Sequence, residues 1–221
     1  HRVIAERLTA VAKGELKRLI INMPPRHTKS EFASIYFPSW MMGLQPNLKI
    51  MQTTHTADLS INFGRKVRNL MDTEEYTKIF QDVNLAADSK SAGKWQTSKG
   101  GEYFAAGVGG AIAGRGADLL IIDDPHSEQD AMSMNLLDSC YEWYTSGPRQ
   151  RLQPGGAIVI VMTRWSTMDL TGRLLTRQTE LNSDQWEVIE LPAIFEDTEE
   201  VLWPEFWQKE ELESVKASIP V

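Results

Sequence analysis

The segment IINMPPRHTKSE, residues 20–31, decides how this chain folds. It predicts a buried strand, a tight turn and the first turn of a helix, with Lys29 and Ser30 at the helix start. Backbone N–H groups of such a loop attract phosphate, the lysine reaches the β- and γ-phosphates, and the hydroxyl holds Mg²⁺. Met23 and Thr28 stand where the pattern G-x-x-x-x-G-K-[ST] has its two glycines. Alone, the segment therefore fits both a phosphate-binding loop and an ordinary strand–turn–helix.

Length and composition are those of an ordinary globular domain, because 221 residues suffice for one substantial core. No apolar run approaches the roughly 20 residues that span a bilayer, so we expect no membrane partner. The single cysteine, Cys140, excludes an internal disulfide and a cysteine-based zinc site. The net charge of −7 argues against a protein that coats nucleic acid through bulk positive charge, but it permits local contacts.

Strand-like and helix-like patterns alternate along most of the chain. The expected helices are 2–13, 29–42, a helix capped by Thr56 or Asp58, 74–80, 131–145, 169–178 and 208–218. The expected strands are 19–21, 49–53, 119–122, 157–162 and 186–190, with a hairpin formed by 95–97 and 102–105. This alternation predicts an α/β fold with a mainly parallel central sheet that carries helices on both faces.

Polar side chains follow two of the expected strands. Asp123 and Asp124 end the aliphatic run 119–122, and Pro125 prevents that strand from continuing. Thr163 ends the apolar run 157–162. The carboxyl ends of parallel strands share one edge of the sheet, where open α/β sheets bind ligands. We therefore expect these residues to lie beside the segment that contains Lys29.

Together these strand ends could hydrolyse a nucleotide, which needs a phosphate cradle, Mg²⁺, a group that orients water, and positive charge for the transition state. Lys29 and Ser30 would cradle the phosphates, and Asp123 would hold Mg²⁺ with Ser30. Asp124, or Glu128 nearby, would orient the attacking water. Thr163 would sense the γ-phosphate through a hydrogen bond.

Two arginines are candidates for the charge that stabilises the transition state. Arg26 lies within the loop itself, and Arg115 lies on a glycine-rich stretch, residues 107–116, from which it could reach a neighbouring subunit. An arginine in this role contributes roughly 10³–10⁵ in rate.

Three motifs, residues 23–31, 114–125 and 161–165, together resemble the large terminase subunit of tailed bacteriophages. The resemblance implies a P-loop ATPase of the additional-strand, RecA-like class, with ATP and Mg²⁺ as cofactors. It also implies a motor that drives double-stranded DNA into a preformed capsid. Such a motor acts in the host cell cytoplasm as a homo-oligomeric ring, a pentamer by resemblance, that docks transiently on the portal protein and is fed by a small terminase subunit.

The same resemblance assigns roles residue by residue. The phosphate loop corresponds to Pro25, Arg26, His27, Thr28, Lys29, Ser30 and Glu31. Ser30 and Asp123 are the implied metal ligands, and Asp124, Arg26, Arg115 and Thr163 the implied catalytic residues, with Thr163 in the motif that couples hydrolysis to movement. Two departures stand out: Thr28 replaces a glycine, and Asp124 is one methylene shorter than the usual glutamate.

The resemblance also predicts the domain organisation. Residues 1–195 would form the P-loop ATPase domain, and residues 196–221 a C-terminal lid or linker that leads to a nuclease domain outside this chain. Two other functions stay open. A helicase-like nucleic-acid translocase shares the loop and the acidic strand end, and a nucleotide-binding scaffold that does not hydrolyse would explain the departures at Thr28 and Asp124.

Overall fold

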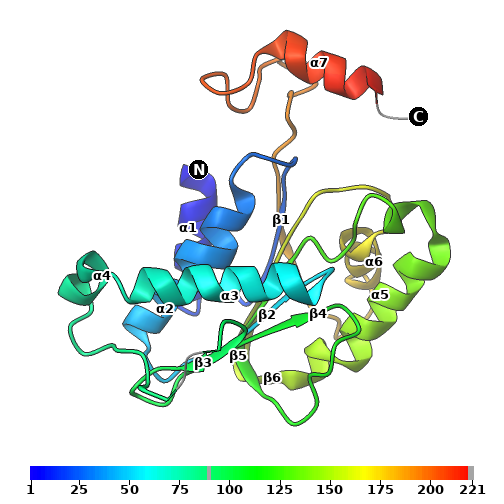
Figure 1. Cartoon of the computed structure of the whole chain (residues 1–221). Helices are drawn as coiled ribbons and strands as arrows, with labels where there is room; N and C mark the ends of the chain where they lie inside the picture. Colours follow the sequence, from blue (N-terminus) through cyan, green and yellow to red (C-terminus); the bar gives the residue numbers. More distant parts are fainter. Residues whose placement is uncertain (89–90, 219–221) are drawn as a thin grey trace.

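A computed structural model describes residues 1–88 and 91–218, and its centre is one seven-stranded sheet (Figure 1). The strands lie in the order β3-β4-β2-β5-β6-β1-β7, and every pairing is parallel except that of β3 with β4. Their bounds are β1 Arg18–Asn22, β2 Lys49–Thr54, β3 Lys94–Gln96, β4 Glu102–Gly107, β5 Ala117–Asp123, β6 Leu152–Met162 and β7 Glu187–Glu190. Because β6 lies between β1 and β5, an additional strand separates the phosphate-loop strand from the acidic strand, as the predicted class requires.

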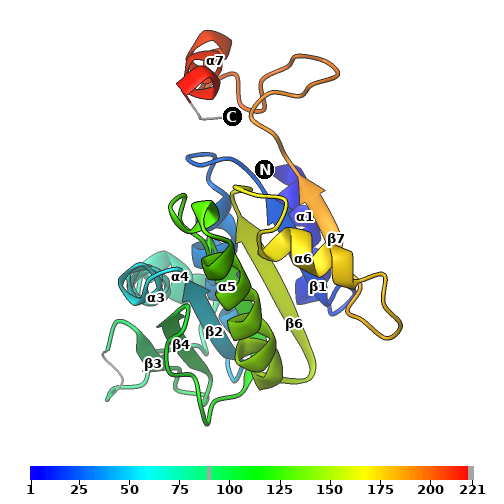
Figure 2. The same ribbon diagram turned by 90° about the vertical axis from the view of Figure 1, so that its right-hand side faces the viewer.

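Helices cover both faces of this sheet, which confirms the predicted architecture. On one face lie α1 (Arg2–Ala12), the continuous pair η1 (Glu31–Tyr36) and α2 (Phe37–Leu44), and α3 (Ala57–Met71). On the other lie α5 (Met134–Ser146) and α6 (Leu170–Arg177), which Figure 2 shows on the viewer's side of the sheet, to the left and right of β6. The shorter elements are α4 (Glu74–Ile79), η2 (Asp130–Met132) and η3 (Pro148–Arg151).

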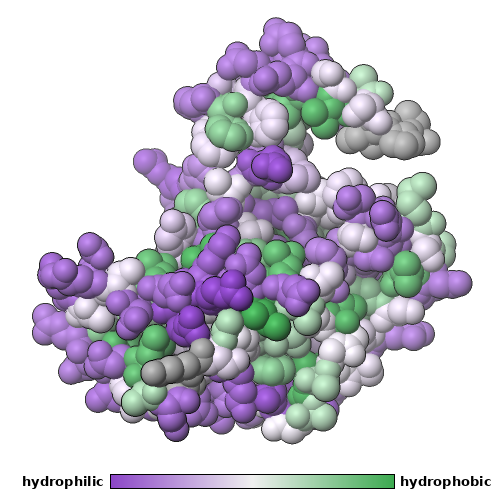
Figure 3. Space-filling view, in the orientation of Figure 1, coloured by the Kyte–Doolittle hydropathy of each residue, from purple (hydrophilic) through white to green (hydrophobic). Residues whose placement is uncertain are grey.

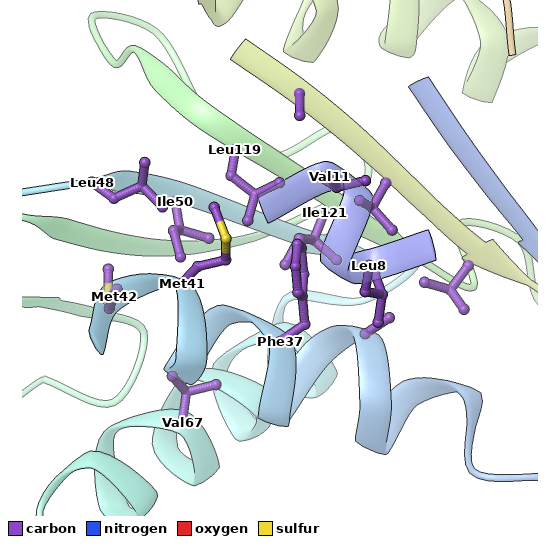
Figure 4. Close-up of a cluster of buried hydrophobic side chains, with 14 of the residues drawn as sticks. Leu8, Val11, Phe37, Met41, Met42, Leu48, Ile50, Val67, Leu119 and Ile121 are labelled. Carbon is purple, nitrogen blue, oxygen red and sulfur yellow. The ribbon is translucent and has the colours of Figure 1, made fainter. Parts of the chain in front are cut away.

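Alternate residues of the central strands fill two separate cores. In β1, Leu19 and Ile21 face one core while Ile20 faces the other, and all three are fully buried. A strand buried on both faces reads as a continuous apolar run, which is why these strands were recognisable in the sequence. Figure 4 shows the first core, where side chains of α1 and α2 meet those of β2 and β5.

Most predicted elements lie within two residues of their observed bounds, but three predictions were wrong in detail. The helix expected at 29–42 extends to Leu44 and contains the π-helical stretch Glu31–Tyr36. The return to α-helix coincides with Pro38, which has no N–H to donate to the preceding turn. The helix expected from 131 begins at Met134, because residues Asp130–Met132 form a tighter 3₁₀ turn.

The third error concerns the start of β6. The sequence suggested a turn at 154–156 followed by a strand, but β6 begins at Leu152. Ala117 pairs with Leu152 and Leu119 with Ala157, so the residues between them bulge out of the ladder. Gly155 supplies the left-handed backbone of this bulge, with φ +79°.

After β7, the chain leaves the sheet as the C-terminal segment, residues 191–218. An isolated bridge between Ile194 and Val201 closes a loop, and α7 (Lys209–Ser218) follows. Figure 3 shows this segment as a lobe joined to the body by a narrow neck. The expected boundary at 195/196 falls in its opening residues, and residues 219–221 of the expected linker lie outside the described part. In that part, no helix combines the length and apolar character needed to cross a membrane.

The double core makes a specific stability prediction. Leu120→Ala removes a fully buried side chain from β5 and should lower the free energy of unfolding by about 2–5 kcal/mol. Leu181→Ala is the matched control, because Leu181 is 92% exposed and should change stability by no more than about 0.5 kcal/mol. Urea unfolding of both variants tests this, and equal losses would contradict the two-core arrangement.

Candidate nucleotide site

The segment after β1 forms a tight loop whose backbone is strained at two residues. Arg26 and Thr28 have φ of 58° and 67°, in the left-handed region that favours glycine. A non-glycine residue there costs roughly 1–2 kcal/mol, and a β-branched threonine is poorly suited to it. The loop keeps this shape because its ends are held by β1 and by the helix that begins beside Lys29. Thr28 therefore occupies a conformation in which the glycine of the usual pattern would be unstrained.

Side chains of the loop differ in exposure. Pro25, Arg26 and Glu31 are exposed, whereas His27 is 1% exposed. The Nδ1–H of His27 donates to the Pro25 carbonyl at 2.8 Å. The Thr28 hydroxyl donates to the His27 carbonyl at 2.6 Å.

Asp123, at the end of β5, is held by two serines of the helix. The hydroxyl of Ser30 donates to Oδ1 at 3.0 Å, and that of Ser34 donates to Oδ2. Gln52, from β2, donates to the Ser34 hydroxyl at 3.1 Å. Asp123 is 1% exposed, so these hydroxyls replace the water that the carboxylate loses on folding.

Lys29 joins three strand ends. Its Nζ lies 2.9 Å from Asp124 Oδ2 and donates to Thr163 Oγ1 at 3.0 Å. The backbone N–H of Thr163 donates to Asp124 Oδ1 at 2.7 Å. The ends of β1, β5 and β6 therefore meet in one set of side chains, which we call the strand-end cluster: Lys29, Ser30, Asp123, Asp124 and Thr163.

The electrostatics of this cluster favour a cation at Asp123. Burial and the neighbouring Asp124 raise the pKa of Asp123 to about 7, although bonds from Ser34 and Ser30 and the Lys29 charge lower it. The hydroxyl of Ser30 and the carboxylate of Asp123 are hard oxygen donors that suit Mg²⁺. No group of three or more His, Cys, Asp or Glu within residues 1–88 and 91–218 could hold a metal. Ser30 and Asp123 fit Mg²⁺ because that ion needs few protein ligands. Waters and phosphate oxygens would supply its other ligands.

Glu128 and Arg115, the candidates beyond the phosphate loop, lie outside the cluster. Glu128 is exposed in the loop after Asp124, whereas Asp124 itself contacts Lys29 and Thr163. Arg115 precedes β5 and pairs with Glu102 at the start of β4, at 2.6 Å, with its guanidinium 3.8 Å from the centre of the Phe104 ring. It therefore lies at the amino ends of the strands, the opposite edge from Lys29. A catalytic role for Arg115 within its own chain is excluded by this placement, and a role across subunits stays a prediction.

Sequence reasoning missed Ser34 and His126. Ser34 lies one helical turn after Ser30, so the i, i+4 spacing of two serines behind the loop was the available signal. His126 follows Asp124 by two residues, is 3% exposed, and its Nε2 accepts the N–H of Leu170 at the start of α6 at 3.1 Å. No sequence pattern indicated that contact, because its two partners are far apart in the chain.

The C-terminal segment touches the phosphate loop through aromatic rings. Trp207 stacks on His27 with ring centroids 6.0 Å apart, and Trp203 meets His1 edge-on at 5.2 Å. His1 in turn stacks on Phe32, one residue beyond the loop. These contacts place the segment against the loop, as a lid or linker would require, and that role stays a prediction.

The strain at Thr28 predicts a stabilising substitution. Thr28→Gly relieves roughly 1–2 kcal/mol of backbone strain in the folded state. Glycine also makes the unfolded chain more flexible, which lowers the free energy of unfolding by about 0.5–1 kcal/mol. We expect a net gain of up to about 1 kcal/mol in the free energy of unfolding, measured by urea unfolding. Thr28→Ala removes the same hydroxyl bond but keeps the Cβ, so a Thr28→Gly variant no more stable than Thr28→Ala would show that the loop is not strained at this residue.

Burial of His126 predicts a dependence of stability on pH. Burial lowers the pKa of His126 below its usual 6.5, so below pH 6.5 the unfolded chain binds a proton that the folded chain refuses. This contribution to stability is complete above pH 6.5 and is lost as the pH falls through the folded pKa. His126→Gln keeps an acceptor without a titrating group. Relative to that variant, the wild type should lose free energy of unfolding between about pH 7 and 5; a constant difference would contradict the prediction.

Known structures share this fold. The HK97 bacteriophage large terminase superposes with a TM-score of 0.57 at 12% identity, over 91% of this chain and 40% of that chain. The ATPase domain of the Thermus phage P74-26 large terminase gives 0.53 at 14% identity, over 96% of this chain and 87% of that domain. A point mutant of that domain gives 0.56 at 15% identity, over 96% and 88%.

These comparisons concern the fold, because the sequences are only distantly similar. The sequence matches no protein-family model and no curated protein. This chain also spans 40% of the HK97 large terminase, so it corresponds to a part of that protein. It has the α/β, RecA-like P-loop fold of the phage large-terminase ATPase domains, with the strand-end cluster at the carboxyl edge of its sheet.

Proposed function

We propose that this chain is the ATP-hydrolysing motor domain of a phage large terminase, which packages double-stranded DNA into a procapsid. One observation carries the proposal. Lys29, Asp124 and Thr163 come from three strand ends and contact one another at 2.7–3.0 Å, beside the Ser30–Asp123 pair. That arrangement supplies the parts that nucleotide hydrolysis needs, on a fold that terminase ATPase domains use.

Each residue has a distinct task in this proposal. When bound, Mg²⁺ neutralises charge on the β- and γ-phosphates, and Ser30 and Asp123 would hold it. Lys29 exchanges its bonds to Asp124 and Thr163 for phosphate oxygens, which frees the Asp124 carboxylate to orient the attacking water. Thr163 keeps its hydroxyl within reach of the same phosphate. Arg26, exposed on the loop, is the candidate in the same chain for stabilising charge in the transition state.

Assembly follows from the same proposal. A motor of this kind works as a homo-oligomeric ring, proposed here as a pentamer, docked on a portal protein in the host cytoplasm and supplied with DNA by a small terminase subunit. The position of the half-buried Arg115 at the amino edge of the sheet, remote from its own Lys29, supports a role toward a neighbouring subunit's nucleotide. Bulk charge does not attract the DNA, since the net charge is −7, so local basic contacts must hold it.

Loss of the loop lysine tests the proposal directly. Lys29→Ala should lower ATP hydrolysis by at least about 100-fold, because Lys29 contacts both Asp124 and Thr163 where the phosphates would bind. Lys78→Ala, at an exposed lysine of α4, is the control and should match wild type. The assay uses the full-length protein with DNA and portal. Retained activity in Lys29→Ala would contradict the site.

A mixing experiment tests the role of Arg115. Arg115→Ala should bind ATP almost as the wild type does but hydrolyse it poorly, since its guanidinium lies at the opposite edge from the chain's own loop. Lys29→Ala subunits retain Arg115, so mixing the two inactive variants should restore part of the activity. Absence of rescue at every ratio would argue against action across subunits.

The two alternative functions give different results in the same assays. A nucleotide-binding scaffold would bind ATP without hydrolysis even with DNA and portal present. A helicase-like translocase would hydrolyse ATP with nucleic acid alone and gain nothing from the portal.

A further inference from the structure

Arg164 directly follows Thr163 of the strand-end cluster, and its guanidinium makes three contacts. Its Nε donates to Asp169 Oδ2 at 2.8 Å, and its Nη2 donates to the Ser166 carbonyl at 3.3 Å. Its Nη1 donates to Glu190 Oε1, also at 3.3 Å. The planar guanidinium has fixed donor directions, so these three partners, two in its own loop and one on β7, determine its orientation. Arg164 therefore links the end of β6 to the start of α6 and the end of β7.

The contact with Asp169 is the firm one. The Asp169 side chain is fully buried, and its other oxygen caps α6 by accepting the Gly172 N–H at 3.0 Å. The turn is also too tight for any other residue at 172, because a Cβ there would lie 1.9 Å from the Thr167 carbonyl oxygen. The loop 163–169 is thus a rigid connection between Thr163 and α6.

The contact with Glu190 is the weak one. The Glu190 side chain is 61% exposed, so its pair with Arg164 contributes little to stability and can break at small cost. Glu190 also accepts from Asn22 Nδ2 at 3.1 Å, and Asn22 is the last residue of β1 before the phosphate loop. The Asn22 carbonyl accepts the N–H of Leu191, the first residue of the C-terminal segment, at 2.9 Å.

These bonds connect the strand-end cluster to the C-terminal segment through one residue. Building on the proposed function, we propose that Arg164 is a positioning residue. It holds Thr163 at the correct distance from Lys29 through Asp169, and it transmits a displacement of Thr163 to Glu190 and the C-terminal segment. Misplacing a reacting group by about 1 Å costs roughly 100-fold in rate, so a residue that acts only through Thr163 can still control hydrolysis.

Steady-state kinetics of the full-length protein with DNA and portal test the positioning role. Arg164→Gln should leave the Kd for ATPγS within about threefold of wild type while kcat falls roughly 10–100-fold. Arg164→Lys, which keeps the charge and one donor direction, should recover part of kcat. Arg177→Gln is the matched control, because Arg177 ends α6 in an exposed pair with Glu180, and this variant should match wild type. Thermal unfolding of each variant separates loss of the α6 cap from loss of kcat.

Two further measurements distinguish positioning from general disruption. Thr163→Val and Arg164→Gln act on one element, so the double variant should lose little more kcat than the worse single variant. On adding ATPγS, amide hydrogen exchange should change at residues 187–191 in the wild type but not in Arg164→Gln. This second readout needs binding only, not hydrolysis.

The possible failures are distinct. If the wild type binds and hydrolyses ATP but Arg164→Gln matches its kcat, or if the two losses add fully, the positioning role is wrong. An ATPγS response at residues 187–191 that persists in Arg164→Gln overturns the transmission to the C-terminal segment. A wild type that binds no ATPγS contradicts the proposed function, and the role of Arg164 falls with it.

Discussion

The charge of Lys29 has to be accommodated where almost no water reaches it. Its side chain is 6% exposed, and a buried ammonium is stable only beside an opposite charge and further hydrogen-bond partners. Asp124 supplies the charge and Thr163 the hydroxyl. Both lie at strand ends. Lys29 therefore has these partners only because β6 and β5 lie next to β1 in that order. Asp124, which pairs with Lys29, also has φ 43°, so its backbone is strained in addition to the burial of the Lys29 charge.

Most of the sheet could be predicted, because its physical signal is local. Strands buried on both faces are continuous apolar runs, and Thr56 and Asp169 cap the helices that they precede. The segment containing Lys29 and the acidic end at Asp123 were recognisable for the same reason. Parallel strands then bring such ends together without any information on long-range contacts. The strand-end cluster was thus predictable as a set of residues, although its bonds were not.

The remaining features depend on contacts between distant parts of the chain. The position of Arg115 could not be predicted from its neighbours in sequence, because pairing with Glu102 and stacking on Phe104 hold it at the edge of the sheet opposite Lys29. His126 depends on Leu170, and the π-helical stretch depends on how the helix accommodates Pro38 while Ser30 and Ser34 face Asp123. The helix and strand propensities of neighbouring residues do not depend on these distant partners, so they could not predict the contacts.

The position of β6 limits how the site can move. Since β6 is hydrogen-bonded to both β1 and β5, the backbones of β1 and β5 are two interstrand spacings apart, roughly 10 Å. Changing that gap would break ladders on both sides of β6 and expose the two cores. The sheet therefore fixes the separation of β1 and β5. Movement at this edge of the sheet is thus confined to the side chains, the loop 163–169 and the segment that follows β7.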